Sequence, residues 1–251
     1  VTDVGYHELL VRWLQFGIFS PVTRTHGTGA PTELWEFGDV VLDRAKDILR
    51  FRYQMRPYIY SCFARAARWD LGYTVMRALQ FDFDYEDVEG ITDQYMFGPS
   101  VLVAPILSPG GSRKVLLPRR IGGWVNFVTN EFISTDGGAQ VIDVKQEGGE
   151  RYQAPPIFVK GGGGIFVWDN RGDVKYSTKH RTGVKDLMVE VYGYPQSGAD
   201  EEPPFRMYED DGETKDGPYA TFDMSVTARG TFVVTKRSYV DVAAERVQVE
   251  E

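Results

Sequence analysis

Apolar residues recur at helical spacing through the first third of the chain. In residues 6–18 they lie four positions apart, which predicts a helix. A longer helical pattern covers residues 39–71. Within it, Pro57 predicts a kink or a new helix start, because proline lacks the amide hydrogen that a helix interior needs. Gly72 follows the last predicted turn as its C′ residue.

Between the two helical patterns lies a short segment, residues 19–27, that is extended in character. Pro21 opens it, β-branched residues follow and Gly27 ends it, which predicts a short strand. In a strand, Arg24 and His26 share one face. A strand between helices that ends in polar groups and a glycine-rich loop is typical of the last unit of an α/β barrel, where active sites lie at that end of the strands.

After Gly72 the helical spacing stops, and short β-rich runs alternate with turn signals. This alternation is typical of sandwich-like β structure. The clearest hairpin turn is Arg229-Gly230, and residues 161–164 predict a tight hairpin rather than a linker, because both flanks are apolar. Residues 238–251 are charged with scattered valines, which predicts a final strand or a frayed tail. The predicted strands cover residues 74–79, 95–97, 101–105, 114–117, 124–127, 140–144, 157–160, 165–168, 187–192, 205–208, 221–228 and 231–236.

Composition and charge narrow the possible functions. The net charge of -8 argues against a nucleic-acid-binding surface, which is usually basic. Aromatic residues reach 14%, and sugar-binding proteins often use such rings, although core packing accounts for most of them. The single cysteine, Cys62, rules out an intramolecular disulfide and leaves the compartment open. No apolar run approaches the ~18–20 residues of a membrane span. The chain starts at Val1 without methionine, so we expect a segment upstream of it.

Two acidic clusters are candidates for chemistry, and each has a plainer explanation. Residues 82–87 contain four carboxylates, and a carboxylate pair is what a glycosidase needs, but acidic residues at strand ends are more often solvated turns. Residues 209–213 are acidic, as in a calcium-binding loop, but they lack the ligand spacing of an EF-hand, so an Asp-Gly turn is favoured. No phosphate-binding loop, dinucleotide fingerprint, nucleophile elbow or paired-histidine zinc motif is present, so we expect no cofactor and no metal.

Several motifs, in order along nearly the whole chain, resemble family 31 glycoside hydrolases. Those similar to the late barrel of that family are residues 8–21 (ELLVRWLQFGIFSP), 24–27 (RTHG) and 35–38 (WEFG). Those similar to its final helix and its two C-terminal β domains are residues 52–60 (RYQMRPYIY), 93–105 (DQYMFGPSVLVAP) and 208–212 (YEDDG).

The resemblance implies a fold class of α/β plus all-β. Residues 1–72 would form the last strand and helices at the C-terminal end of a (β/α)8 TIM barrel. Residues 73–168 would form a proximal antiparallel β-sandwich domain, and residues 169–251 a distal one.

The resemblance also implies retaining cleavage of α-glycosidic bonds by two aspartates, one as nucleophile and one as acid and base. Those aspartates precede the Arg12–Gln15 stretch in the family, so we expect no catalytic residue in this chain. His26 matches the family's substrate-binding histidine, and Arg24 matches an arginine that we expect to orient acidic groups. Trp35 and Phe37 are candidates for the pocket mouth, with core packing as an equal alternative.

The predicted function is therefore part of an enzyme that acts on an oligosaccharide. It would remove terminal non-reducing α-linked xylose or glucose, with an α-xylosidase favoured and an α-glucosidase as the alternative. The partner would be the N-terminal portion of the same enzyme as a separate chain. Two other readings stay open: a non-catalytic carbohydrate-binding β module, and an inactive fragment.

Overall fold

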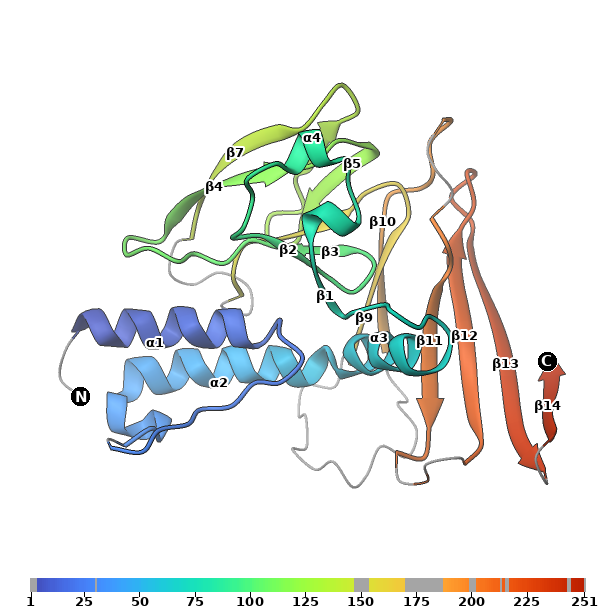
Figure 1. Ribbon diagram of the computed structural model, residues 1–251, viewed down its shortest axis with the longest axis horizontal. Coiled ribbons are helices and arrows are strands. Elements are labelled where there is room, and N and C mark those ends of the chain that lie inside the picture. Colours follow the sequence, from blue (N-terminus) through green and yellow to red (C-terminus); the bar gives the residue numbers. More distant parts are fainter. Residues whose placement is uncertain are drawn as a thin grey trace.

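The protein combines a group of N-terminal helices with several antiparallel sheets. Its structure, a computed structural model, describes residues 4–29, 31–146, 154–169, 187–198, 202–212, 214, 217–242 and 245–250. Two long helices lie side by side beneath one group of sheets, and a further sheet stands beside the third helix (Figure 1). Within the described residues, no helix has the length and apolar character that a membrane span requires.

Both predicted helical regions are confirmed. The helical elements are α1 (Val4–Gly17), the 3-10 helix η1 (Leu34–Phe37), α2 (Asp39–Gln54) and α3 (Arg56–Arg68). The helical structure is interrupted between α2 and α3. Pro57 therefore lies in the first turn of a new helix, where its missing amide hydrogen costs nothing. The C′ role predicted for Gly72 is wrong. The amides of Trp69 and Asp70 already bond the carbonyl of Arg65, and Gly72 lies in the turn that follows.

The strand predicted in residues 19–27 does not form. Residues 23–27 have no regular structure and take part in no backbone–backbone hydrogen bond within the described chain. The helices α1 and α2 run in the same direction, and this segment returns between their ends (Figure 1). That is the position of a strand in a β/α unit. A strand also needs a hydrogen-bonded neighbour, and no described strand pairs with this segment.

A six-stranded antiparallel sheet and a two-stranded sheet follow the helices. The larger sheet has the order β1-β2-β3-β8-β5-β6. Its strands are β1 (Met76–Ala78), β2 (Tyr95–Phe97), β3 (Val101–Val103), β5 (Arg120–Asn126), β6 (Phe132–Thr135) and β8 (Ile157–Lys160). The smaller sheet pairs β4 (Ser112–Leu117) with β7 (Gln140–Lys145). Between β1 and β2 lie η2 (Leu79–Phe81) and the short helix α4 (Tyr85–Val88). Trp124 and Phe158 are completely buried in the core that the two sheets share.

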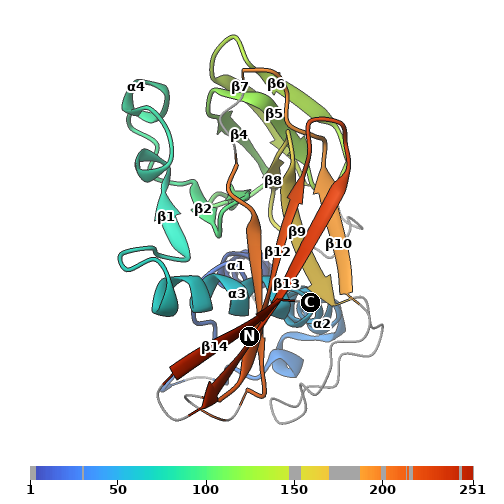
Figure 2. The same cartoon turned by 90° about the vertical axis from the view of Figure 1, so that its right-hand side faces the viewer.

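The last third of the chain forms two further antiparallel sheets (Figure 2). One pairs β9 (Gly164–Asp169) with β10 (Leu187–Tyr192). The other is a four-stranded meander of β11 (Phe205–Asp210), β12 (Tyr219–Val226), β13 (Phe232–Val242) and β14 (Glu245–Glu250). The Arg229-Gly230 hairpin is confirmed, since β12 pairs with β13 across it. The tail forms a strand over residues 245–250.

Each of the twelve predicted β runs overlaps a strand, so the β-rich character after Gly72 is confirmed. The strand β6 was not predicted. The turn at residues 161–163 is tight as predicted, but the hairpin is wrong, because β8 and β9 do not pair with each other. The ladder of β9 and β10 crosses the predicted limit at residue 168, and residues 170–186 lie outside the described chain; the domain limits stay a prediction.

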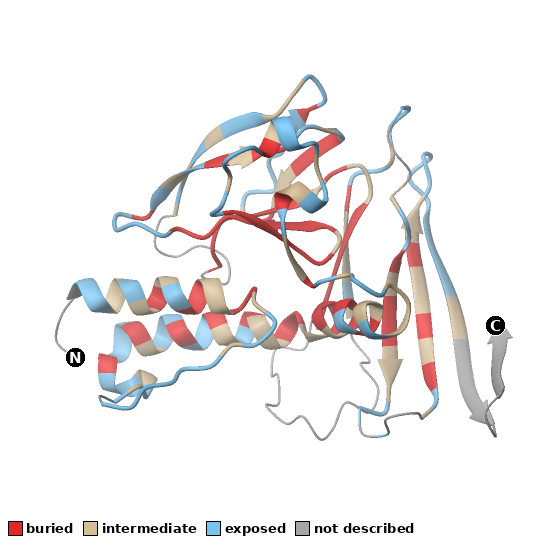
Figure 3. Ribbon diagram, in the orientation of Figure 1, coloured by how far each residue is buried: buried red, intermediate tan, exposed pale blue. Residues whose placement is uncertain are grey.

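One aromatic cluster joins the helices to the β structure. Phe51 of α2 stacks on Phe127 with ring centroids 5.6 Å apart, and Phe127 meets Phe166 of β9 edge to face at 5.6 Å. Tyr58 of α3 lies 5.0 Å from Phe166 and stacks on Phe205 of β11 at 5.2 Å. Buried positions accordingly concentrate where the helices meet the strands (Figure 3). The helices and both β regions therefore share one continuous core.

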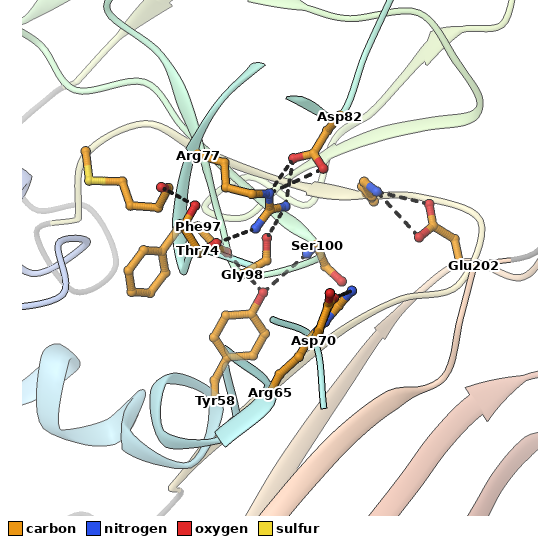
Figure 4. Close-up of polar contacts among 12 residues, drawn as sticks. Tyr58, Arg65, Asp70, Thr74, Arg77, Asp82, Phe97, Gly98, Ser100 and Glu202 are labelled. Carbon is orange, nitrogen blue, oxygen red and sulfur yellow. Dashed lines mark hydrogen bonds and ion pairs between the residues drawn. The ribbon is translucent and has the colours of Figure 1, made fainter. Parts of the chain in front are cut away.

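Polar contacts reinforce this junction (Figure 4). The Tyr58 hydroxyl donates to the carbonyl of Phe97 at 3.1 Å and accepts the amide of Ser100 at 3.3 Å. Burial raises the pKa of Tyr58 well above its ordinary value, so the hydroxyl keeps its proton. Nearby, Arg77 forms an ion pair with Asp82 at 2.7 Å and donates to the carbonyl of Gly98 at 3.1 Å.

Candidate functional site

A groove of about 440 Å³ lies between α1 and the segment that returns from it, residues 20–32. Both polar and apolar side chains line it. The polar lining residues include Arg24, Thr25, His26 and Thr32. The apolar lining residues are Tyr6, Leu10, Trp13, Leu14, Phe16, Val22 and Phe37. The structure therefore brings two of the three predicted site residues, Arg24 and His26, into one groove.

Arg24 and His26 contact each other directly. The Nη2 atom of Arg24 lies 3.0 Å from Nδ1 of His26, and both side chains are exposed. A guanidinium group only donates hydrogen bonds, so Nδ1 accepts in this contact. The ring hydrogen of the neutral imidazole is then on Nε2, which is free to donate to a ligand. The contact therefore selects one tautomer of His26 and aims one donor away from Arg24.

The end of α1 sets the course of the segment that carries these residues. The Ser20 hydroxyl lies 2.6 Å from the carbonyl of Gly17. Thr23 then crosses the end of the helix so closely that a Cβ atom added to Gly17 would lie 2.5 Å from the Thr23 Oγ1. A side chain at Gly17 would therefore force the hydroxyl of Thr23 to move. The absence of a side chain at Gly17 lets Thr23 pack against the end of the helix.

The third predicted site residue, Trp35, stands apart from the groove. It lies on η1, is 66% exposed and is not among the residues that line the groove. Its neighbour Phe37 is buried, stacks on Tyr6 with centroids 5.8 Å apart and does line the groove. Trp13 also lines it and is 67% exposed. The sequence pattern placed Trp13 only beside the apolar stripe of the first helix. The position of this large aromatic side chain beside the stripe, and not within it, was the signal that Trp13 does not face the core.

The acidic clusters do not join the groove. No Asp or Glu is among the described residues that line it. Asp82 lies in a turn but is bound to Arg77, Asp84 is exposed directly before α4, and the other two carboxylates of this cluster lie in α4, so the prediction of solvated turns holds only in part. Asp210 accepts hydrogen bonds from the Tyr60 hydroxyl at 2.8 Å and from the Gly212 amide at 2.9 Å, as expected for an Asp-Gly turn. Across the described ranges, no group of three potential metal ligands comes together.

Profiles of known protein families match the chain in two consecutive segments. The profile described as "Glycosyl hydrolases family 31 TIM-barrel domain" matches residues 2–62. The profile described as "Glycosyl hydrolase family 31 C-terminal domain" matches residues 72–165. The first segment contains the groove, and the second contains the six-stranded sheet.

The sequence is also similar to those of individual glycosidases. The chain is 35% identical over 212 residues to an α-xylosidase of Saccharolobus solfataricus, covering 84% of this chain and 26% of that protein. It is 33% identical over 211 residues to α-glucosidase 2 of Bacillus thermoamyloliquefaciens, covering 82% and 24%. The chain thus spans about a quarter of the length of these relatives.

A solved structure shares the fold. The GH31 dextranase of Flavobacterium johnsoniae, determined with isomaltotriose, superposes with a TM-score of 0.70 at 26% identity, covering 95% of this chain and 28% of that one. The barrel profile and the C-terminal profile occur here in one chain and in that order, and the resemblance of the sequence motifs is confirmed. This chain belongs to glycosyl hydrolase family 31.

Proposed function

We propose that this chain is the C-terminal part of a retaining α-glycosidase that removes terminal α-linked xylose or glucose from the non-reducing end of oligosaccharides. Support comes from the family and from the names of its relatives, an α-xylosidase and an α-glucosidase. The observation that carries the proposal is the Arg24–His26 pair in the lining of the groove. An α-xylosidase is the favoured activity.

In this proposal His26 binds the sugar in the subsite next to the scissile bond. Its Nε2–H donates to a sugar hydroxyl, because Arg24 occupies Nδ1. Arg24 keeps further N–H donors that would hold a carboxylate of the site in place. A hydrogen bond that strengthens as the oxocarbenium-like transition state forms would raise the rate and not only the affinity.

The two catalytic aspartates would come from a polypeptide segment that completes the barrel, either in a separate chain or in the same longer chain. The backbone of residues 23–27 supports this partner, because it takes part in no backbone–backbone hydrogen bond within the described chain and its groups can pair with a neighbouring strand. The apolar side chains that line the groove would pack against such strands. On α1, Tyr6, Leu9 and Trp13 are 48%, 56% and 67% exposed, which fits a surface that a partner covers.

We also propose the finer architecture and the domain limits given by the sequence. Residues 73–168 and 169–251 would each form an antiparallel β-sandwich behind the last barrel unit, residues 1–72. Limited proteolysis followed by mass spectrometry tests these limits, since stable fragments should end near residues 72 and 168. Fragments that end within the core of either unit would contradict them.

The first experiment is gel filtration of native material followed by intact mass spectrometry. We expect either a second polypeptide in equal amount or a longer single chain, in both cases with activity on p-nitrophenyl α-xyloside or α-glucoside. A lone 28.4 kDa species without activity would refute the proposal. If that species still bound xyloglucan or malto-oligosaccharides in calorimetry, it would be a carbohydrate-binding module instead, and with no binding it would be an inactive fragment.

The second experiment tests the role of His26 in the active enzyme. His26→Ala should lower kcat/KM by about 10–1,000-fold, equivalent to roughly 1.4–4 kcal/mol of transition-state stabilisation. The matched control is Arg50→Gln, because Arg50 is exposed and, among the described residues, its ion-pair partner is Asp47 at 2.9 Å. A change below about twofold for His26→Ala would remove His26 from the site.

A further inference from the structure

Arg52 is a half-buried arginine whose described partners are backbone carbonyls. It lies in the last turn of α2. Its Nη1 donates to the carbonyl of Ile18 at 2.6 Å, and its Nη2 donates to the carbonyl of Pro21 at 3.1 Å. No carboxylate of the described residues forms an ion pair with it. A guanidinium that is partly removed from water without a carboxylate needs another reason for its position.

The surroundings of Arg52 lower its pKa, but not enough to remove its charge at neutral pH. Burial lowers the pKa of Arg52 to about 10, and the hydroxyl of Tyr95 on β2 is the other titratable group that acts on it. At neutral pH the guanidinium therefore stays protonated. Ile18 directly follows the last residue of α1, where the helix dipole concentrates negative partial charge. Arg52 thus caps the C-terminal end of α1 from a neighbouring helix.

The second carbonyl that Arg52 holds lies in the segment that leads to the groove. Pro21 begins the run that continues through Thr23 to Arg24 and His26. The planar fork of a guanidinium fixes two acceptors at once, which a single ammonium group does not do. One side chain therefore ties the end of α1 and the start of the site segment to α2.

We propose that Arg52 is a positioning residue that holds the Arg24–His26 segment at the angle that the substrate contact requires. This inference rests on the proposed role of His26. Arg52 does not reach the groove itself, since it is not among the residues that line it. A small displacement of the segment would move the Nε2–H of His26 off its acceptor, and misplacement by about 1 Å can cost about 100-fold in rate.

The test uses the active native enzyme that contains this chain. Arg52→Gln removes the charge and the fork, and should lower kcat/KM by about 10–100-fold. Arg52→Lys keeps the charge but satisfies one carbonyl, and should recover about half of that loss on a logarithmic scale. Arg50→Gln is the matched control on the same helix and should stay within about twofold of the parent. Thermal unfolding of each variant reports whether it folds.

A double-mutant cycle with His26→Ala separates positioning from a general structural effect. If Arg52 acts through His26, adding Arg52→Gln to His26→Ala should slow the enzyme by less than about threefold. A further loss as large as that of Arg52→Gln alone would overturn the proposal. If Arg52→Gln does not fold, the same cycle with Arg52→Lys decides. An unchanged rate for His26→Ala alone would instead refute the proposed function of the groove.

Discussion

The hydroxyl of Tyr58 joins α3 to the hairpin between β2 and β3, and its removal gives a quantitative test of that junction. Tyr58→Phe keeps the ring and hence the stacking on Phe205 at 5.2 Å. It removes one donor to the carbonyl of Phe97 and one acceptor for the amide of Ser100. The lost bond to Phe97 is worth about 0.5–1.5 kcal/mol, and a buried amide without a partner costs about 1–3 kcal/mol. Together these give an expected loss of about 1.5–4.5 kcal/mol in the free energy of unfolding.

Urea denaturation followed by tryptophan fluorescence measures this loss as a shift of the transition midpoint at constant slope. The control is Tyr85→Phe, because Tyr85 is 61% exposed and should change stability by less than about 0.5 kcal/mol. If Tyr58→Phe matched the control within error, the hydroxyl would not be needed by Ser100, and the polar part of the junction would contribute nothing to stability.

Two further predictions concern the described contacts away from the groove. Glu202 bridges Arg120 at 3.0 Å and Lys160 at 3.2 Å, so Glu202→Gln leaves two buried cations and should cost about 2–4 kcal/mol at pH 7 in urea denaturation. Burial lowers the pKa of Lys160 in the folded protein below its ordinary value. At pH values between the folded-state and the unfolded-state pKa, the unfolded chain therefore binds more protons than the folded one. In that pH range Lys160 makes the stability rise with pH. Without Glu202 the pKa of Lys160 falls further, so the loss of unfolding free energy caused by Glu202→Gln should shrink from pH 7 to pH 10. An exposed control, Asp43→Asn, should show no such trend. A loss that is independent of pH would contradict the reasoning. Cys62 is 2% exposed and burial raises its pKa to about 12, so it should react with Ellman's reagent at pH 8 only in urea; rapid labelling of the folded protein would show that α3 opens locally.

Much of the local structure followed from the sequence because side-chain periodicity is a local property. The spacing of apolar residues predicted α1, α2 and α3, and Pro57 predicted the break between the last two. The β runs after Gly72 were likewise found, because β-branched and aromatic clusters between glycine turns have few other structures open to them. The candidate pair, Arg24 and His26, came from its place after a helix and before a glycine, together with the resemblance to a known family.

What the sequence did not determine was pairing between distant segments. The edges of β8 are both occupied, by β3 and β5, so β9 has to pair with β10 instead of completing a hairpin. Residues 19–27 have strand-like composition but no described neighbour to form a ladder, and they remain irregular. Arg52 opens the family motif at residues 52–60, but the sequence did not show what it contacts, because its acceptors at Ile18 and Pro21 lie far from it in the chain. The amino-acid pattern records which side chains must leave water, whereas the tertiary structure decides which hydrogen-bond partner each edge and each buried charge can reach, since that depends on contacts between residues far apart in the chain.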